Sequence, residues 1–275
     1  MRAGLLAIGP ADSAPSRPLA RRLAESQIAL KLAGGVFVLG AWEIAVRLLA
    51  PAYVAKPSGI AAALPGVLTS ATVLRAAAIT LSAVGQGLVI AVVFGVLVGL
   101  LAGSLRLAER ALSPYVNGLY AMPMVAIVPL LTIWFGYTSA ARLATIVFAS
   151  FFPIAMNVGD GARSVPAEYL EVARAYRARP HRIWFGITLP SSLPYLIAGI
   201  RLAVGRALVS AVVAEFIISV DGLGFYILFQ SRTFHHNEAL VAVLLLAGFA
   251  VAVDAAIEWI VRTRLRWYRA GEKTA

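Results

Sequence analysis

The sequence predicts an all-α polytopic membrane protein with six transmembrane helices, and three observations predict this class. The 275-residue chain is 60% hydrophobic and only 13% charged, whereas an average soluble domain is about 25% charged. Residues 80–104 and 112–141 contain no charged side chain, and each stretch exceeds the roughly 20 helical residues that cross a bilayer core. The third observation is the placement of the basic residues, which marks one side of the membrane.

The six predicted spans are long apolar stretches. The first is the least regular, because Lys31, Glu43 and Arg47 interrupt it. Glu43 and Arg47 are spaced i,i+4 with the acid first, which favours a helix end near the interface. The predicted spans are residues 28–50, 80–104, 112–141, 143–158, 202–220 and 240–257.

The remaining segments complete the predicted organisation. We expect a disordered cytoplasmic tail over residues 1–27, because prolines and scattered arginines fill it. An external loop with a short surface helix follows the first span at 51–79. The core of five helices extends over 80–260 and includes a polar loop at 164–192, and a basic cytoplasmic tail ends the chain at 261–275.

The basic residues predict the orientation. With the N-terminus inside the cell, 19 of the 24 lysines and arginines fall on cytoplasmic segments, as expected for short cytoplasmic loops. Both termini are therefore predicted to be cytoplasmic, and the formal charge of +11 indicates topology and not nucleic-acid binding. The connection between the fourth and fifth spans contributes, with its edges, Arg163, Arg174, Arg177, Arg179, Arg182, Arg201 and Arg206.

Several kinds of chemistry are excluded by residues that the sequence lacks. Without cysteine, neither a disulfide nor a thiolate metal site can form, and the adjacent His235 and His236 have too few neighbouring ligands for a closed metal site. The sequence has no G-x-x-x-x-G-K-[ST] phosphate loop, G-x-S-x-G elbow or H-E-x-x-H pair. We therefore predict transport, with no catalytic residues, cofactor, metal or ATPase site in this chain.

Glycines mark a packing surface on the second predicted span. Gly95, Gly99 and Gly103 recur at every fourth residue, which forms a smooth stripe that another helix can approach closely. Glycine is also common in membrane helices in general. We favour packing within one chain over a seam between two copies.

Prolines and polar residues point to a pathway through the third to fifth spans. Pro114, Pro123 and Pro129 should break the third span repeatedly, and the freed carbonyls favour a position against protein or a polar pathway. A bent but purely structural helix is an equal alternative. The residues predicted to line the pathway are Asn117, Met122, Pro123, Asn157 and Glu215.

Glu215 has two interpretations. It lies near the outer end of the fifth span in an otherwise apolar stretch, and an intramembrane carboxylate is by default a functional hypothesis. The alternative is a helix-end acid that is paired with a nearby basic or hydroxyl group.

The segment EVARAYRARPHRIWFGITLP is unusually polar for this chain, because arginines, a glutamate, a histidine and two prolines crowd together in it. Pro166, shortly before it, suits the first turn of a helix, so that Glu168 and Glu171 lie near the positive end of the helix dipole. Pro180 should end this helix.

A second short helix is expected over residues 181–187, and Pro190 is expected to close the unit before the fifth span. The polar loop is therefore predicted to be a cytoplasmic helix–turn–helix with a small, smooth surface and a charged rim. Such a shape suits docking into a groove of a soluble partner.

The same segment resembles the cytoplasmic signature of type I ABC importer permeases, E-A-A-x3-G-x9-I-x-L-P. Glu171 and Ala173 match its first and third positions, and Ile187, Leu189 and Pro190 match its closing triplet. The stretches MPMVAIVPLLTIWFG and AEFIISVDGLGFYI are similar to the nitrate/sulfonate/taurine branch of that family. The resemblance covers roughly residues 30–270.

Two positions depart from the signature. Val172 replaces an alanine, which is a mild change, and Arg177 stands where the family has glycine. That glycine suits a helix end with positive φ, a conformation that costs an arginine on the order of 1 kcal/mol. Either the turn is built differently here, or Arg177 makes a compensating contact.

The resemblance implies a permease that forms a dimer with a second copy in the bacterial inner (plasma) membrane. An ABC ATP-binding subunit would dock on the loop and bind ATP and Mg²⁺, and an extracytoplasmic substrate-binding protein would deliver a small anion such as nitrate, a sulfonate or taurine. The alternative is a secondary transporter driven by an ion gradient, which should show titratable residues near mid-membrane and often an internal repeat. The predicted coupling residues are Glu168, Glu171, Ala173, Arg174, Arg177, Ile187, Leu189 and Pro190.

Overall fold

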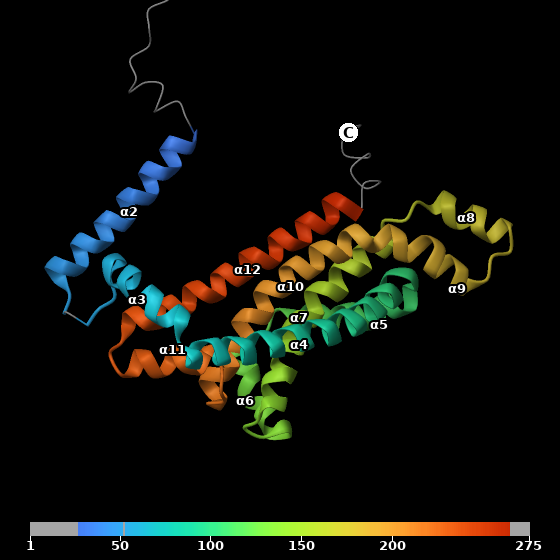
Figure 1. The fold of residues 1–275 in the computed structure, drawn as a ribbon. Helices are drawn as coiled ribbons and strands as arrows, with labels where there is room; N and C mark the ends of the chain where they lie inside the picture. Colours follow the sequence, from blue (N-terminus) through green and yellow to red (C-terminus); the bar gives the residue numbers. More distant parts are fainter. Residues whose placement is uncertain (1–26, 52, 265–275) are drawn as a thin grey trace, which may run out of the picture. The chain divides into compact units, whose positions relative to one another are not determined.

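The computed structural model describes residues 27–51 and 53–264, in which every regular element is a helix (Figure 1). The predicted all-α class is confirmed. Apart from residues 27 and 261–264, the predicted terminal tails lie outside the described residues. The elements are α2 (Gln27–Leu49), α3 (Pro57–Thr69), α4 (Ala71–Ser104), α5 (Arg106–Tyr120), α6 (Met124–Phe135), α7 (Ser139–Arg163), α8 (Ala167–Ala175), α9 (Pro180–Ile183), the π-helix η1 (Trp184–Thr188), α10 (Leu189–Ile218), α11 (Leu223–Arg232) and α12 (His236–Arg264).

The chain divides into two compact units, residues 1–58 and 59–275. In the first unit, α2 is apolar on all sides and exposes side chains such as Phe37 and Leu48, as expected for a helix surrounded by lipid. Its two predicted interface residues form an ion pair, in which Nε of Arg47 lies 2.6 Å from Oε1 of Glu43. Ser58 donates its backbone N–H and its hydroxyl to the same carboxylate.

Five helices in the described part are long and apolar enough to cross a bilayer, and the bent pair α5 and α6 makes a sixth if it is counted as one span. The predicted span limits were too short at several ends. Residues 71–79, which we expected in the external loop, are the first turns of the 34-residue α4. A helix longer than the roughly 20 residues that the bilayer core requires can carry Arg75 in its first turns outside the lipid.

The core of the second unit is built on α7, which packs along both α4 and α10 (Figure 1). The predicted glycine stripe on α4 forms the contact with α7, so packing within one chain is confirmed. A Cβ atom on Gly95 would lie 2.8 Å from Cγ2 of Ile154, and one on Gly99 would lie 2.6 Å from the carbonyl oxygen of Ala155. Only glycine permits this close approach of the two backbones.

Two ends of this bundle can be distinguished by connectivity. At the α8 end, α7 finishes and the polar loop begins; at the α11 end, α10 finishes and α12 begins. At the α11 end, buried side chains of α3 join those of α4, α11 and α12 in one apolar cluster. The short helix in the segment expected as an external loop therefore packs on the protein through Ile60 and Val67.

Candidate functional site

The polar loop at the α8 end consists of α8, a four-residue turn and α9. α8 buries none of its side chains, and the predicted residues Glu168, Glu171 and Arg174 are exposed while Ala173 is half-buried. α8 ends at Ala175, several residues before Pro180, and Pro180 begins α9 and does not itself end the first helix.

Arg177 adopts the backbone conformation that the family signature assigns to glycine. Its φ is 52°, its N–H donates to the carbonyl of Arg174 at 2.8 Å, and the N–H of Ala178 donates to the carbonyl of Ala173 at 2.9 Å. This pair of hydrogen bonds is the Schellman motif that commonly ends a helix with a left-handed residue. The turn is therefore built as in the signature, and within the described residues no ion pair or hydrogen bond of the exposed Arg177 side chain offsets the strain.

A row of large apolar side chains on α8 and on its C-cap residue Tyr176 was missed by the sequence interpretation, which expected a small, smooth surface. Tyr169, Val172 and Tyr176 are 60%, 56% and 85% exposed, and their spacing of three and four residues places them on one side of the helix. That spacing was a signal available in the sequence. We call these three residues the α8 apolar row.

Pro190 does not close the unit before the fifth span. Instead, α9, η1 and α10 run on as one apolar helical stretch from Pro180 to Ile218. Proline lacks the N–H that a helix needs, and the π-turn over Trp184–Thr188 directly precedes it, with the Leu189 N–H donating to the Trp184 carbonyl. A π-turn shifts the hydrogen-bond ladder by one residue, which lets the helix pass through the proline. Ile187 lies in this turn, and Leu189 and Pro190 are the first residues of α10.

The predicted third span is a bent pair of helices. α5 and α6 meet at 106° across Ala121–Pro123, while Pro114 and Pro129 lie inside continuous helices. We expected repeated breaks, but Pro114 and Pro129 are accommodated in mid-helix, as helices of membrane proteins allow, and a single break at Pro123 turns the chain. Met122 and Pro123 are exposed at this break.

The two predicted pathway asparagines lie on different elements. Asn117, on α5, helps line a small pocket between α4, α5 and α7 of about 170 Å³. Asn157, on α7, donates its amide to the carbonyl of Pro153 at 2.7 Å, and Gly199 of α10 approaches it closely. The structure brings neither of them to Glu215.

Glu215 is completely buried at the α11 end, and its carboxylate accepts hydrogen bonds from three donors. Its Oε1 accepts from the Thr80 hydroxyl at 2.8 Å and from Nη1 of Arg142 at 3.2 Å, and its Oε2 accepts from the Gly224 N–H at 2.7 Å. The Thr80 oxygen accepts in turn from the Leu223 N–H, and Arg142 also donates to the Asp221 carbonyl. The acid is thus paired with a basic and a hydroxyl group.

Glycines allow the α10–α11 turn to close over this carboxylate. A Cβ atom on Gly222 would collide with the carboxylate of Glu215, and one on Gly224 would lie 2.8 Å from Oε2. Three helices and one turn therefore meet at a single buried acid, which no neighbour larger than glycine could cover in this way.

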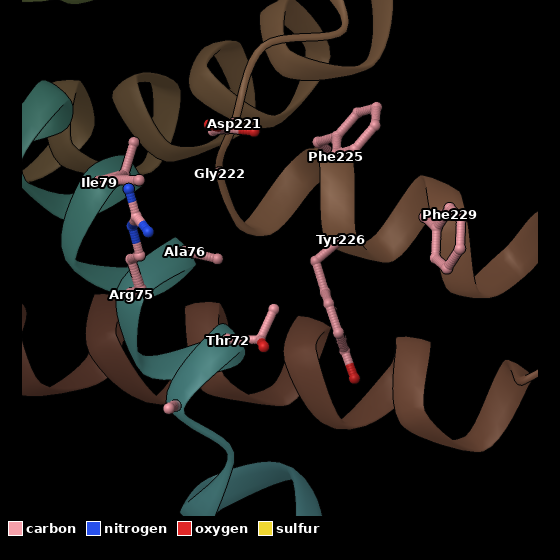
Figure 2. Close-up of a pocket in the computed structure, with 10 residues that line it drawn as sticks. Thr72, Arg75, Ala76, Ile79, Asp221, Gly222, Phe225, Tyr226 and Phe229 are labelled. Atoms are coloured by element: carbon pink, nitrogen blue, oxygen red, sulfur yellow. The ribbon is translucent and has the colours of Figure 1, made fainter.

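A pocket of about 550 Å³ opens beside this network, between α4 and α11. Figure 2 shows Arg75 extending along α4 to Ile79, on the side of Asp221, while Phe225, Tyr226 and Phe229 project from α11. No predicted site residue lies in this pocket.

Two arginines that we assigned to the cytoplasmic loop and its edges lie well inside α10. Arg201 pairs with Asp254 of α12 at 3.0 Å and lies 3.9 Å from Glu258. The guanidinium of Arg206 lies over the ring of Tyr120, 3.9 Å from its centroid. The assignment to loops was wrong because an arginine can lie inside an apolar helix when an acid or an aromatic ring of a neighbouring helix stabilises its charge.

Comparison with known families decides the class of this protein. The profile of the family described as "Binding-protein-dependent transport system inner membrane component" matches residues 91–266. The chain belongs to this family. It is an ABC transporter permease of the type I importer class, a multi-pass membrane subunit of a kind that has no ATPase site of its own. Membership implies a separate ATP-binding subunit and a substrate-binding protein.

Relatives differ in the substrates for which they are named. The taurine transport system permease protein of Escherichia coli is 31% identical over 82% of this chain and 81% of its own length. The formylaminopyrimidine transport permease protein of Halalkalibacterium halodurans is 28% identical over 82% of this chain and 90% of its own. A bicarbonate transport system permease protein of Synechocystis is 29% identical over 66% of this chain, and the match spans 65% of that relative.

A solved structure of the MetNI methionine ABC transporter in an inward-facing conformation shares the fold. It covers 70% of this chain and 95% of its own, with a TM-score of 0.62 and 21% identity. At this identity the likeness concerns the arrangement of the helices alone.

Proposed function

We propose that this permease forms the membrane pathway of an ATP-driven importer of small organic or inorganic anions, and that α8, its turn and α9 are the docking site for the ATP-binding subunit. ATP and Mg²⁺ would be bound by that subunit. One observation carries the proposal: the exposed helix α8 is followed, after a four-residue turn, by the helical stretch of α9, η1 and α10, which is long enough to cross the membrane.

The surface of α8 supports the docking role. The α8 apolar row leaves large hydrophobic side chains in water, and exposed apolar patches of this kind mark interaction sites. Glu171 and Arg174 are exposed on the same helix, and surface charges orient an encounter with a partner. A helix that presents such a row fits a groove on a soluble partner.

The anion class is supported by the relatives named for taurine and bicarbonate and by basic side chains inside the spans. We further propose that two copies of the permease assemble and that the α8 end faces the cytoplasm. Family membership argues against the secondary transporter, and the buried acid Glu215 and the acids Asp254 and Glu258 are each paired with arginine.

Reconstitution tests the proposal. The full-length permease, co-expressed with its ATP-binding subunit, should co-purify with it and take up taurine, nitrate or an alkanesulfonate into proteoliposomes when ATP and the binding protein are supplied. Uptake that is driven by a proton or sodium gradient without an ATP-binding subunit would contradict it.

A further inference from the structure

Arg206 lies in the interior of α10 (Leu189–Ile218), a helix long and apolar enough to cross a bilayer. Glu215, at the α11 end, is nine residues further along the helix, which is about 13 Å at the helical rise of about 1.5 Å per residue. In the other direction, Ser192 and Tyr195 pack against Gly161 near the α8 end of α7. A cation therefore stands roughly midway between the two ends of the α7–α10 pair.

The positive charge of Arg206 has no acidic partner among the described residues. Arg201, on the same helix, pairs with Asp254 and Glu258 of α12, and Arg142 pairs with Glu215. Arg206 instead meets the aromatic ring of Tyr120, the last residue of α5. An unpaired charge in a membrane helix is costly and marks a functional site unless another group solvates it.

The contact with Tyr120 leaves the hydrogen-bonding capacity of Arg206 in place. A cation–π contact uses the face of the guanidinium, whereas its five N–H donors lie in the guanidinium plane. These donors can hold the two oxygens of a carboxylate or sulfonate side by side, a geometry that lysine does not offer.

A cavity of about 500 Å³ adjoins these donors. It lies between α10 and the α5–α6 break, and its lining consists of Tyr120, Ala121, Met122, Met124, Gly205, Arg206 and Val209. Pro123 provides no side-chain cap for α6, so the first N–H groups of that helix add positive potential at the same break.

We propose that Arg206 binds the oxyanion group of the substrate in this cavity, and that the substrate is a small organic anion such as a short alkanesulfonate. Apart from Arg206 and the hydroxyl of Tyr120, the side chains of the lining are apolar or thioether groups. A nitrate or bicarbonate ion would leave most of this surface unused, whereas a short alkyl chain packs well against methionine, whose side chain adapts its shape. The proposal rests on the proposed importer function and names its substrate class.

The absence of cysteine from the chain allows a test by thiol labelling of the full permease, co-purified with its ATP-binding subunit. Val209→Cys places a thiol in the cavity. Its reaction rates are measured with the anionic sulfonatoethyl methanethiosulfonate and the cationic trimethylammonioethyl methanethiosulfonate, each relative to a free thiol. We expect about a tenfold preference for the anionic reagent, since a difference of about 1.4 kcal/mol suffices, and we expect butane-1-sulfonate, but not butan-1-ol, to slow the labelling.

Matched variants separate binding from structure. Arg206→Gln should abolish the preference, and Arg206→Lys should keep part of it. Val251→Cys is the control, because it lies in a cavity beside Arg201, whose charge Asp254 and Glu258 offset; it should show no preference. Equal labelling of Val209→Cys by both reagents would overturn the proposal even if Arg206→Gln fails to fold, as would a preference unchanged by Arg206→Gln. Co-purification of the ATP-binding subunit is a separate readout, so failure of the importer function would be recognised independently.

Discussion

Nη1 of Arg142 lies 3.2 Å from Oε1 of Glu215, and both side chains are almost completely buried, with 8% and 0% of their surface exposed. The pair joins α7 to α10, and the Thr80 hydroxyl adds α4 to the same carboxylate. Side chains of the three core helices, α4, α7 and α10, therefore interact at one acid near the α11 end.

Removal of the cation should be strongly destabilising. Arg142→Met leaves the buried carboxylate with neutral donors only, and the loss of one partner of a buried ion pair costs about 3–5 kcal/mol. Thermal unfolding of the full-length permease in nanodiscs should show a marked fall in Tm. The double variant Arg142→Met/Glu215→Met should recover much of the loss, and a single variant as stable as the parent would show that the pair contributes little.

Arg177→Gly should stabilise the loop. The left-handed conformation costs a residue with a side chain about 1 kcal/mol, which glycine avoids. Unfolding of the purified protein reports the gain, and Arg177→Ala, which keeps the strain while it removes the charge, is the control. If Arg177→Gly assembles normally but loses transport, the arginine side chain itself has a role in coupling.

The glycine stripe predicts opposite results for two substitutions on α4. In Gly99→Ala the new methyl group would lie 2.6 Å from the Ala155 carbonyl oxygen and 2.8 Å from Cβ of Val158, and such overpacking costs about 1–3 kcal/mol. Gly85→Ala meets nothing within 4 Å and should be neutral or stabilising by up to about 1 kcal/mol. Equal Tm values for the two variants would refute the tight contact with α7.

The docking proposal predicts that charge and apolar surface on α8 are both required. Glu171→Lys and Tyr176→Ser should each reduce co-purification of the ATP-binding subunit about tenfold, since a charge reversal or the loss of an aromatic anchor costs about 1.4 kcal/mol or more. Membrane insertion should be unchanged. Glu238→Lys, in the first turn of α12 at the α11 end, should leave co-purification intact, and normal association of Glu171→Lys would count against the docking role.

The class of the fold could be predicted from the sequence because lipid imposes a minimum length on apolar stretches, as residues 80–104 show. The limits of the spans could not, because charged residues do not end a helix by themselves. Arg75 lies within the first turns of α4, and Arg201 lies inside α10, where it has acidic partners on α12. Those partners are more than 50 positions away in the chain, beyond the reach of local patterns.

The candidate site, like the fold, could be predicted only in part. The signature identified Arg177 as the position of a left-handed turn, but both alternatives expected there were wrong, because the turn is built as in the signature and no contact of the side chain compensates for the strain. The α8 apolar row was present in the spacing of Tyr169, Val172 and Tyr176. The contact of Arg206 with Tyr120 depends on how α5, α6 and α10 meet in space. The π-turn before Pro190 could not be predicted from the local sequence, because it forms where a helix continues through a residue that lacks an N–H.

That π-turn keeps α9, η1 and α10 one helical stretch of 39 residues, and Figure 1 shows the stretch changing direction between α9 and α10. The helical backbone therefore connects Pro180, in the proposed docking site, to Arg206 and Glu215 without an intervening loop. The π-turn lies between Pro180 and α10, in the region where the helix axis changes direction in Figure 1, and π-turns are a known cause of such bends.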